Sequence, residues 1–161
     1  MRIFQFNGTN YNQIQLIYAG FTVWFIKLSE QKLIFTGTKG KVCIYAHNGS
    51  QYLHLQCFET NESVIYDMYV SEDISGFVLG GSNEECKVYE LLNNTYELIS
   101  QTVIGEHVAE VIVDPLEEYL ILETYQSIQT FYKCRDECKS CYFPNNCSAC
   151  VEGYQLQAGK C

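Results

Sequence analysis

Residues 44–52, with the sequence Ile-Tyr-Ala-His-Asn-Gly-Ser-Gln-Tyr, read as a short apolar strand, a polar turn and a tyrosine that opens the next strand. Residues 3–11 and 88–96 repeat this pattern. The tyrosines that follow the turn, Tyr11, Tyr52 and Tyr96, are therefore separated by 41 and then 44 residues. Self-similarity at a period of this length is the sequence signature of a repeat architecture.

A second series of segments has the same period. Residues 26–30, 68–72 and 111–115 each form a short apolar strand that runs into a polar turn, in steps of 42 and 43 residues. Four short strands per unit, joined by tight turns, are typical of a β-meander blade, and no stretch sustains the helical period of 3.6 residues. The sequence therefore predicts an all-β fold: a partial β-propeller of about three four-stranded antiparallel meander blades.

The strand count predicts an incomplete set of blades. It gives two strands of a first unit, two full blades, and three strands of a further one. Asn-Gly at 7–8 and at 48–49 predicts two-residue hairpin turns, because both central positions of such turns need positive φ. The chain begins inside a strand and shows no charged-then-apolar leader, which favours a piece of a longer protein.

Composition and charge narrow the class of protein. Apolar residues make up 47% of the 161 and charged ones 18%, which suits a packed core. The net charge of −9 repels phosphate backbones and excludes nucleic-acid binding, and the apolar runs are far shorter than a membrane span. Residues 1–58 carry a charge of +4 and residues 59–123 carry −14. This asymmetry predicts a protein partner or self-association; a solvated acidic surface is the alternative.

Six of the nine cysteines lie in the last 28 residues, at Cys134, Cys138, Cys141, Cys147, Cys150 and Cys161. This density predicts a domain boundary, with the blades in 1–133 and a cysteine module in 134–161. So short a module needs disulfides to fold, each contributing about 2–4 kcal/mol. Zinc is the alternative, because the module contains two Cys-x2-Cys knuckles. Only five residues separate the knuckles, however, where zinc ribbons usually have 15 or more.

The blades resemble a known family. Residues 34–45, Ile-Phe-Thr-Gly-Thr-Lys-Gly-Lys-Val-Cys-Ile-Tyr, resemble the end of a WD repeat, with Lys39 in place of the structural Asp. Gly105-Glu106-His107 is similar to the Gly-His that opens such a repeat. The resemblance covers residues 2–133 and implies degenerate WD-like or quinoprotein-like propeller blades.

The tail resembles the furin-like cysteine-rich repeat of growth-factor receptors. Residues 134–138 and 144–150 carry this resemblance, together with Gly153-Tyr154. It implies the bridges Cys134–Cys141, Cys138–Cys147 and Cys150–Cys161. Blades followed by such a repeat look like large cysteine-rich surface proteins of protists. That likeness implies an extracellular or cell-surface, non-enzymatic segment without a cofactor, in which the loops bind partners and the module acts as a spacer.

Several further residues are candidates for modification or binding. Asn-x-Ser/Thr sequons, which are glycosylation candidates as well as ordinary turn sequences, occur at Asn7, Asn48, Asn61, Asn93 and Asn146. The acidic turns 71–73 and 83–85 are candidates for weak Ca²⁺ binding, although the EF-hand pattern is missing. Trp24 is expected in the core, and Asp67, inside a strand, is expected to have a structural role.

The other three cysteines and the histidines give weaker signals. Cys43 and Cys57 lie at opposite ends of one predicted hairpin and would pair if the register brings them together, but we expect buried free thiols at both and at Cys86. No histidine has a marked nucleophile partner, so no catalytic residue is predicted. Two alternative functions remain: an intracellular zinc-binding interaction module, and an extracellular hydrolase with a propeller fold.

Overall fold

The computed structural model describes residues 1–29, 31–114, 119–134, 137–143 and 146–161, and these residues form strands and turns without any helix. The strands are β1 (Arg2–Phe6), β2 (Tyr11–Leu16), β3 (Val23–Leu28), β4 (Lys32–Gly37), β5 (Lys41–His47), β6 (Tyr52–Glu59), β7 (Ile65–Val70), β8 (Gly76–Gly81), β9 (Glu85–Leu92), β10 (Thr95–Val103), β11 (Val108–Val113), β12 (Tyr119–Thr124), β13 (Ile128–Tyr132), β14 (Cys138–Phe143) and β15 (Asn146–Cys150). Among the described residues, no helix is long and apolar enough to cross a membrane.

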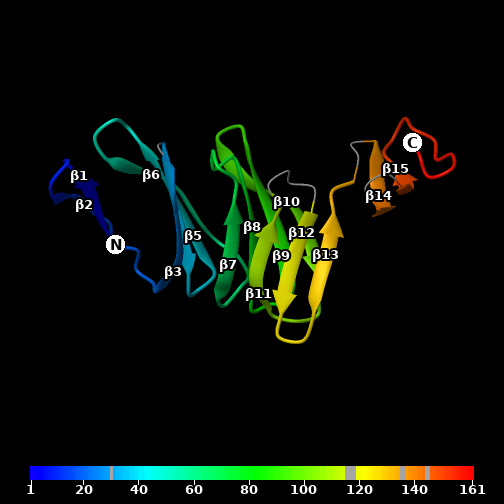
Figure 1. The fold of residues 1–161 in the computed structure, drawn as a ribbon, viewed down its shortest axis with the longest axis horizontal. Coiled ribbons are helices and arrows are strands. Elements are labelled where there is room, and N and C mark those ends of the chain that lie inside the picture. The colour runs from blue at the N-terminus through cyan, green and yellow to red at the C-terminus, as the bar shows by residue number, and fades with distance from the viewer. Residues whose placement is uncertain (30, 115–118, 135–136, 144–145) are drawn as a thin grey trace.

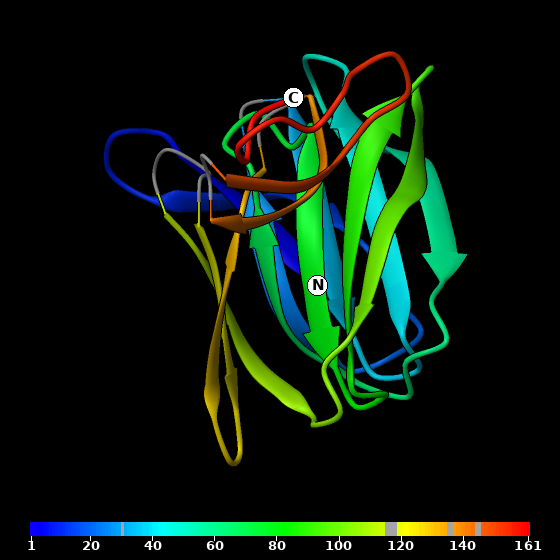
Figure 2. The same ribbon diagram turned by 90° about the vertical axis from the view of Figure 1, so that its right-hand side faces the viewer.

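The strands form a row of antiparallel meander sheets (Figure 1). The hairpin β1–β2 is followed by two four-stranded sheets, β3–β6 and β7–β10, and then by the three-stranded sheet β11–β13. The first strands β3, β7 and β11 contact one another in turn, as the inner strands of propeller blades do. This arrangement confirms the predicted all-β, partial-propeller fold and its count of two, four, four and three strands. Figure 2 looks along the row and shows β14 and β15 running across the direction of these strands.

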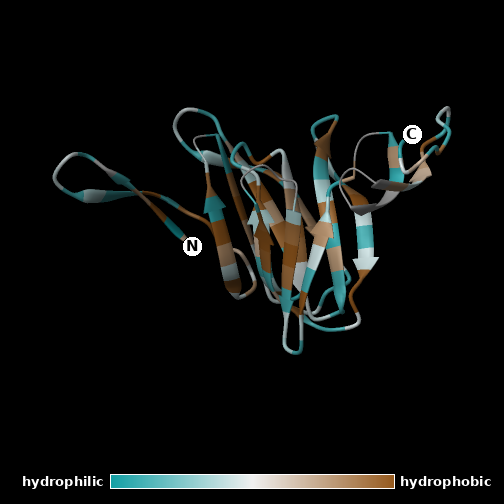
Figure 3. Ribbon diagram, turned by 45° about the vertical axis from the view of Figure 1, so that its right-hand side comes forward, coloured by the Kyte–Doolittle hydropathy of each residue, from teal (hydrophilic) through white to brown (hydrophobic). Residues whose placement is uncertain are grey.

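Apolar side chains fill the spaces between successive sheets. Figure 3 shows hydrophobic residues, in brown, along the strands of these sheets. Successive residues of a strand point to opposite faces of its sheet. On β8, Phe77 accordingly packs with Ile34 and Ile44 of the sheet before it, while Val78 packs with Leu122 of the sheet after it. The second four-stranded sheet is therefore buried on both faces, which explains the nearly continuous apolar run of β8.

The outer strands of neighbouring sheets are joined by a repeated glutamine contact. Gln15 of β2 donates to the backbone carbonyl of Tyr52 at 2.6 Å and accepts from its backbone N–H at 2.7 Å. Gln56 of β6 makes the same pair of hydrogen bonds with Tyr96 of β10, at 3.4 and 3.0 Å. The side-chain amide thus takes the place of a peptide group and holds a tyrosine at the start of the next outer strand, the first residue of β6 and the second of β10.

The hairpin turns differ from the prediction. The Asn-Gly pairs lie in four-residue loops, 7–10 and 48–51, in which only the glycines, Gly8 and Gly49, have positive φ. The asparagine side chain accounts for the difference, because its carbonyl oxygen accepts hydrogen bonds from the backbone N–H groups two and three residues on. Two-residue turns with positive φ at both centres occur instead at Asn93–Asn94 and at Ala158–Gly159.

Trp24 is 63% exposed, so its expected place in the core is wrong. On β3, Phe25 packs against the second four-stranded sheet, whereas Trp24, Ile26 and Leu28 point to the opposite face. On that side the first unit contributes only β1 and β2, which correspond to outer strands, and Ile26 and Leu28 accordingly remain 48% and 55% exposed.

Candidate functional site

The cysteine module is a hairpin closed by disulfides. β14 and β15 pair antiparallel, and the described bridges join Cys138 to Cys147 and Cys150 to Cys161. These coincide with two of the three pairings that the resemblance implies. Cys134 is also disulfide-bonded, while the side chain of Cys141, its implied partner, lies outside the described residues.

The sulfur atoms of this module lie close together. Those of Cys138, Cys147 and Cys161 are all within 4.8 Å of one another. Among the described residues, this is the one group of three or more His, Cys, Asp or Glu side chains that is close enough to share a metal ion. With the cysteines reduced, this cluster would present thiolates of the kind that zinc prefers.

Cys43 and Cys57 form a disulfide, so the expectation of free thiols at these two positions is wrong. They face each other directly across β5 and β6, with their Cα atoms 4.2 Å apart, a placement that depends on the register of the hairpin. Cys86 is free and buried, as expected. Burial raises the pKa of its thiol to about 12, so the reactive thiolate is scarce at neutral pH.

A buried ion pair occupies the equivalent place in the next sheet. Lys87 and Gln101 face each other across β9 and β10, each 44 residues after Cys43 and Cys57. The Lys87 ammonium lies 2.6 Å from Glu62 Oε1 and 2.9 Å from Glu85 Oε2. Burial opposes the charge on Lys87, but the hydrogen bonds with both carboxylates outweigh it and hold the pKa of Lys87 above its usual value.

Sequence reasoning missed this ion pair, although a signal was present. Lys87 is the one lysine or arginine in residues 59–123, which contain fifteen acids. It also stands at an inward position of a strand, where an apolar residue is usual, and its side chain is only 3% exposed. A charge in such a position needs a partner.

The acidic turns named as Ca²⁺ candidates are engaged in local contacts. Asp73 accepts hydrogen bonds from Ser71 Oγ and from the Ser75 N–H, and the bonds with Ser75 lower the pKa of its carboxyl. Glu85 is paired with Lys87, whose hydrogen bond lowers the pKa of Glu85. Ca²⁺ binding at these turns stays a prediction.

Asp67 has the structural role expected of it. Its carboxylate accepts a hydrogen bond of 2.8 Å from the N–H of Val111, which lies on the inner strand of the next sheet. In the loop before that strand, Glu106 accepts hydrogen bonds from the hydroxyls of Thr124 and Ser127. These carboxylates therefore link elements of the propeller-like part.

The glycosylation candidates lie in exposed turns. Asn7, Asn48, Asn61 and Asn93 are exposed, while the side chain of Asn146 lies outside the described residues. In the loops at 7 and 48 the hydroxyl of the third sequon residue donates to the asparagine side-chain oxygen at 3.1 Å. Exposure permits attachment of a glycan at these four positions, and its presence stays a prediction.

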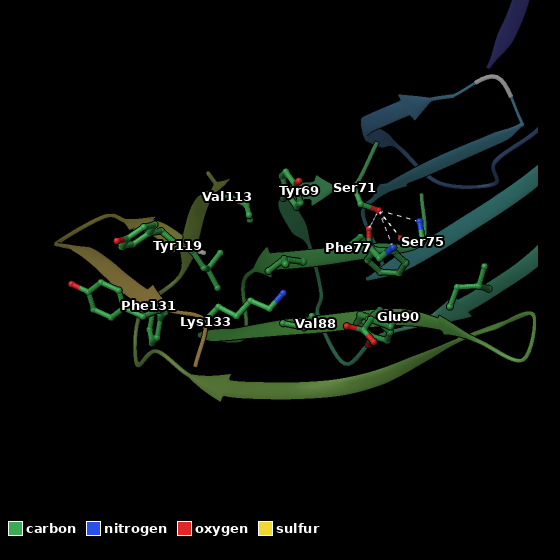
Figure 4. A pocket seen from close by; sticks show the side chains of 16 residues that line it. Tyr69, Ser71, Ser75, Phe77, Val88, Glu90, Val113, Tyr119, Phe131 and Lys133 are labelled. Atoms are coloured by element: carbon green, nitrogen blue, oxygen red, sulfur yellow. Dashed lines mark hydrogen bonds between the residues drawn. The ribbon is translucent and has the colours of Figure 1, made fainter. Parts of the chain in front are cut away.

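A cavity of about 430 Å³ opens between the second four-stranded sheet and the three-stranded sheet (Figure 4). Val88 and Glu90 of β9 and the β7–β8 turn form one wall. Leu120 of β12, Phe131 of β13 and Lys133 form the other. The lining is mainly apolar and includes a few polar side chains, as the lining of a binding pocket usually does.

Solved structures share the fold of this chain. It aligns to a protein named as a 6-phosphogluconolactonase from Bacteroides uniformis with a TM-score of 0.68 and 18% identity, over 84% of this chain and 45% of the other. It aligns to the periplasmic gluconolactonase of Pseudomonas aeruginosa with a TM-score of 0.59 and 12% identity, over 69% and 35%. The β-propeller domain of Myceliophteria thermophila Cps50 aligns with a TM-score of 0.58 and 13% identity, over 68% of this chain and 39% of the other.

These comparisons establish a likeness of fold alone, because all the identities are below 25%. This chain spans between 35% and 45% of the length of these structures. No known protein family matches the chain, and no curated protein matches it either.

Proposed function

We propose that this chain is a non-enzymatic structural and recognition segment of an extracellular or cell-surface cysteine-rich protein. The propeller-like sheets present loops and the inter-sheet cavity to a partner, and the cysteine module is a furin-like repeat that acts as a spacer. The disulfides support this proposal most directly. Three described bridges occur in two different parts of the chain, and such bonds persist in oxidising compartments.

The names of the lactonase neighbours do not lead us to propose an enzyme. Two serines, Ser71 and Ser75, line the cavity. Ser71 is committed to its own turn, because its Oγ accepts hydrogen bonds from the N–H groups of Ser75 and Gly76 and donates to Asp73. A nucleophilic serine needs an adjacent base and a free approach to substrate. The hydrogen bonds of Ser71 fit a turn-capping role instead.

Zinc binding is a second candidate, which the sulfur cluster favours. Cys138, Cys147 and Cys161 would be three of the ligands if the module were reduced. This alternative makes the chain an intracellular interaction module, because reducing conditions keep cysteines as thiols. The two proposals require different oxidation states of the same residues and are therefore separable.

Disulfide mapping by mass spectrometry tests the choice, on protein secreted from a eukaryotic host and purified without reductant. We expect three bridges within the module, the Cys43–Cys57 bridge and one free thiol, Cys86, that reacts only after denaturation. The same preparation, treated with a glycosidase, should lose mass if the exposed sequons carry glycans. Six unlinked module cysteines with one equivalent of zinc would defeat the extracellular proposal and support the second candidate.

A further inference from the structure

In each of the two four-stranded sheets and in the three-stranded sheet, an apolar or aromatic residue of the second strand lies opposite an aromatic residue of the third strand, at equivalent positions. Phe77 pairs directly with Tyr89 in the second four-stranded sheet. Leu33 and Tyr45 are the equivalent pair in the first. Leu120 and Phe131 are the equivalent pair in the three-stranded sheet. Each pair faces the preceding sheet, so the three sheets can be compared position by position.

In both four-stranded sheets a tyrosine at the start of the outer strand completes this surface. It is Tyr52, 8% exposed, in the first sheet and Tyr96, 4% exposed, in the second. The Tyr96 ring lies 5.4 Å from the Phe77 ring, and its hydroxyl donates to the carbonyl of Ile74 in the β7–β8 turn. The ring therefore closes the space between Phe77 and the inner turn.

The three-stranded sheet has no such strand or tyrosine. Tyr96 follows Tyr89 by seven residues, and seven residues after Phe131 the chain has Cys138. Cys138 is bonded to Cys147 within the β14–β15 hairpin, so the chain leaves the sheet at this point. Among the described strands, β13 pairs on one edge only, with β12. The cavity of about 430 Å³ remains open, with Leu120 and Phe131 in its wall.

We propose that this cavity and the free edge of β13 bind an extended peptide segment of a partner protein, with a tyrosine of the peptide entering the cavity. A strand edge offers a row of backbone donors and acceptors that an added strand satisfies, and a pocket for one side chain supplies selectivity. In the two four-stranded sheets, an outer strand with a tyrosine at its first or second residue fills the equivalent place, and a tyrosine-containing strand is therefore the occupant that fits.

The described strands of this chain are already committed elsewhere. β2, which opens with Tyr11, pairs with β1 and is held to the first four-stranded sheet through Gln15. β14 is tied to β15 by the Cys138–Cys147 bridge. A second copy would have to break one of these arrangements to donate its strand, and a partner protein would not. For this reason we assign the site to a partner.

One contact of the complete sheets is missing at this site. In the first four-stranded sheet, Gln56 holds Tyr96 of the next sheet and lies opposite Ile44 in its own hairpin. The equivalent residue of the second four-stranded sheet, opposite Val88, is Ser100. A serine side chain is too short to bond both backbone groups of the incoming residue. Binding therefore depends on the aromatic ring and on the β13 edge.

This inference rests on the proposed recognition function, and its test is independent of the oxidation test. The probe is a synthetic peptide with the sequence of residues 95–103, Thr-Tyr-Glu-Leu-Ile-Ser-Gln-Thr-Val, compared with a peptide that has alanine in place of the tyrosine. Each is titrated into the full oxidised chain by isothermal calorimetry. We expect binding of the tyrosine peptide and at least a tenfold weaker association of the alanine peptide.

Two variants locate the site. Leu120→Trp fills the cavity and should abolish peptide binding, whereas Ile121→Trp, on the opposite face of the same strand, should retain it. Thermal unfolding of both variants confirms that each is folded before titration. Equal binding of the two peptides, no binding of either, or equal loss in both variants would overturn the proposal. So would a concentration-dependent dimer that Leu120→Trp dissociates, because it would assign the cavity to a second copy. None of these outcomes alters the disulfide map.

Discussion

Replacement of Lys87 by methionine tests the role of the buried ion pair. Methionine keeps most of the apolar stem and removes the ammonium that lies 2.6 Å from Glu62 Oε1. The Glu62 side chain is 1% exposed and would retain only the hydrogen bond from the Asn83 N–H, at 2.6 Å, among the contacts described. Breaking a buried pair by removing one partner destabilises a protein by about 3–5 kcal/mol.

This loss is large enough to measure directly. For a domain of this size, 1 kcal/mol corresponds to about 2–4 °C in Tm, so Lys87→Met should lower Tm by roughly 6–20 °C. Circular dichroism of the strand signal during heating, and urea unfolding at pH 7, report the change. The double variant Glu62→Gln with Lys87→Met removes the ammonium and the more deeply buried of its two carboxylates, and it should recover much of the loss. The carboxylate that remains, Glu85, is 17% exposed and still accepts hydrogen bonds from Asn61 and Gln101.

The effect should also depend on pH. The pKa of Glu85 is lowered by its hydrogen bond with Lys87. A carboxyl with a depressed folded pKa contributes stability above its unfolded pKa and loses it as the pH falls through the folded value. The difference between the native protein and Lys87→Met should therefore shrink on acidification below about pH 4.5. A Tm shift under about 2 °C at pH 7, or no recovery in the double variant, would refute the argument.

Three further predictions concern the cysteines and the packing between sheets. Replacing both Cys43 and Cys57 by serine should lower the free energy of unfolding by about 3 kcal/mol, because their bridge closes a loop of 14 residues. Urea unfolding measures this change, and reductant should then have no added effect on the first four-stranded sheet. Gly80→Ala should destabilise by about 1–3 kcal/mol, since its Cβ would lie 2.4 Å from Cγ1 of Val108. Gly76→Ala on the same strand, whose Cβ would come no closer than 3.3 Å to a neighbour, is the comparison for crowding. Cys86 should resist iodoacetamide at pH 8 in the native protein and react promptly in urea, because its pKa is about 12; rapid native labelling, followed by mass spectrometry, would contradict its burial.

Much of the fold followed from local sequence patterns. Alternating apolar residues and turn-forming Asn, Gly and Ser repeat along the chain, and each hairpin is made within one unit. The strand count of each sheet was therefore predictable without knowledge of distant contacts. The structural role of Asp67 was predictable too, because an acid inside an apolar strand requires a partner.

The turns and the exposure of Trp24 show where local reasoning fails. Asn-Gly is a strong signal for a two-residue turn, yet at 7–8 and 48–49 the asparagine side chain bonds the backbone and stabilises a longer loop. Trp24 has a core-like sequence environment, but burial also requires a neighbouring sheet on the same face. The sequence pattern shows neither the hydrogen bonds of the asparagine side chains nor the absence of a sheet beside Trp24.

The sequence by itself determined that this protein is a series of meander sheets followed by a cysteine-rich segment, because period, turn chemistry and cysteine spacing are local properties. Only the tertiary structure decided that Cys43 meets Cys57, that Lys87 meets Glu62, and that a cavity opens beside Phe131. These features depend on the register between strands and on which strand is missing from a sheet. Both are set by contacts between residues far apart in the chain.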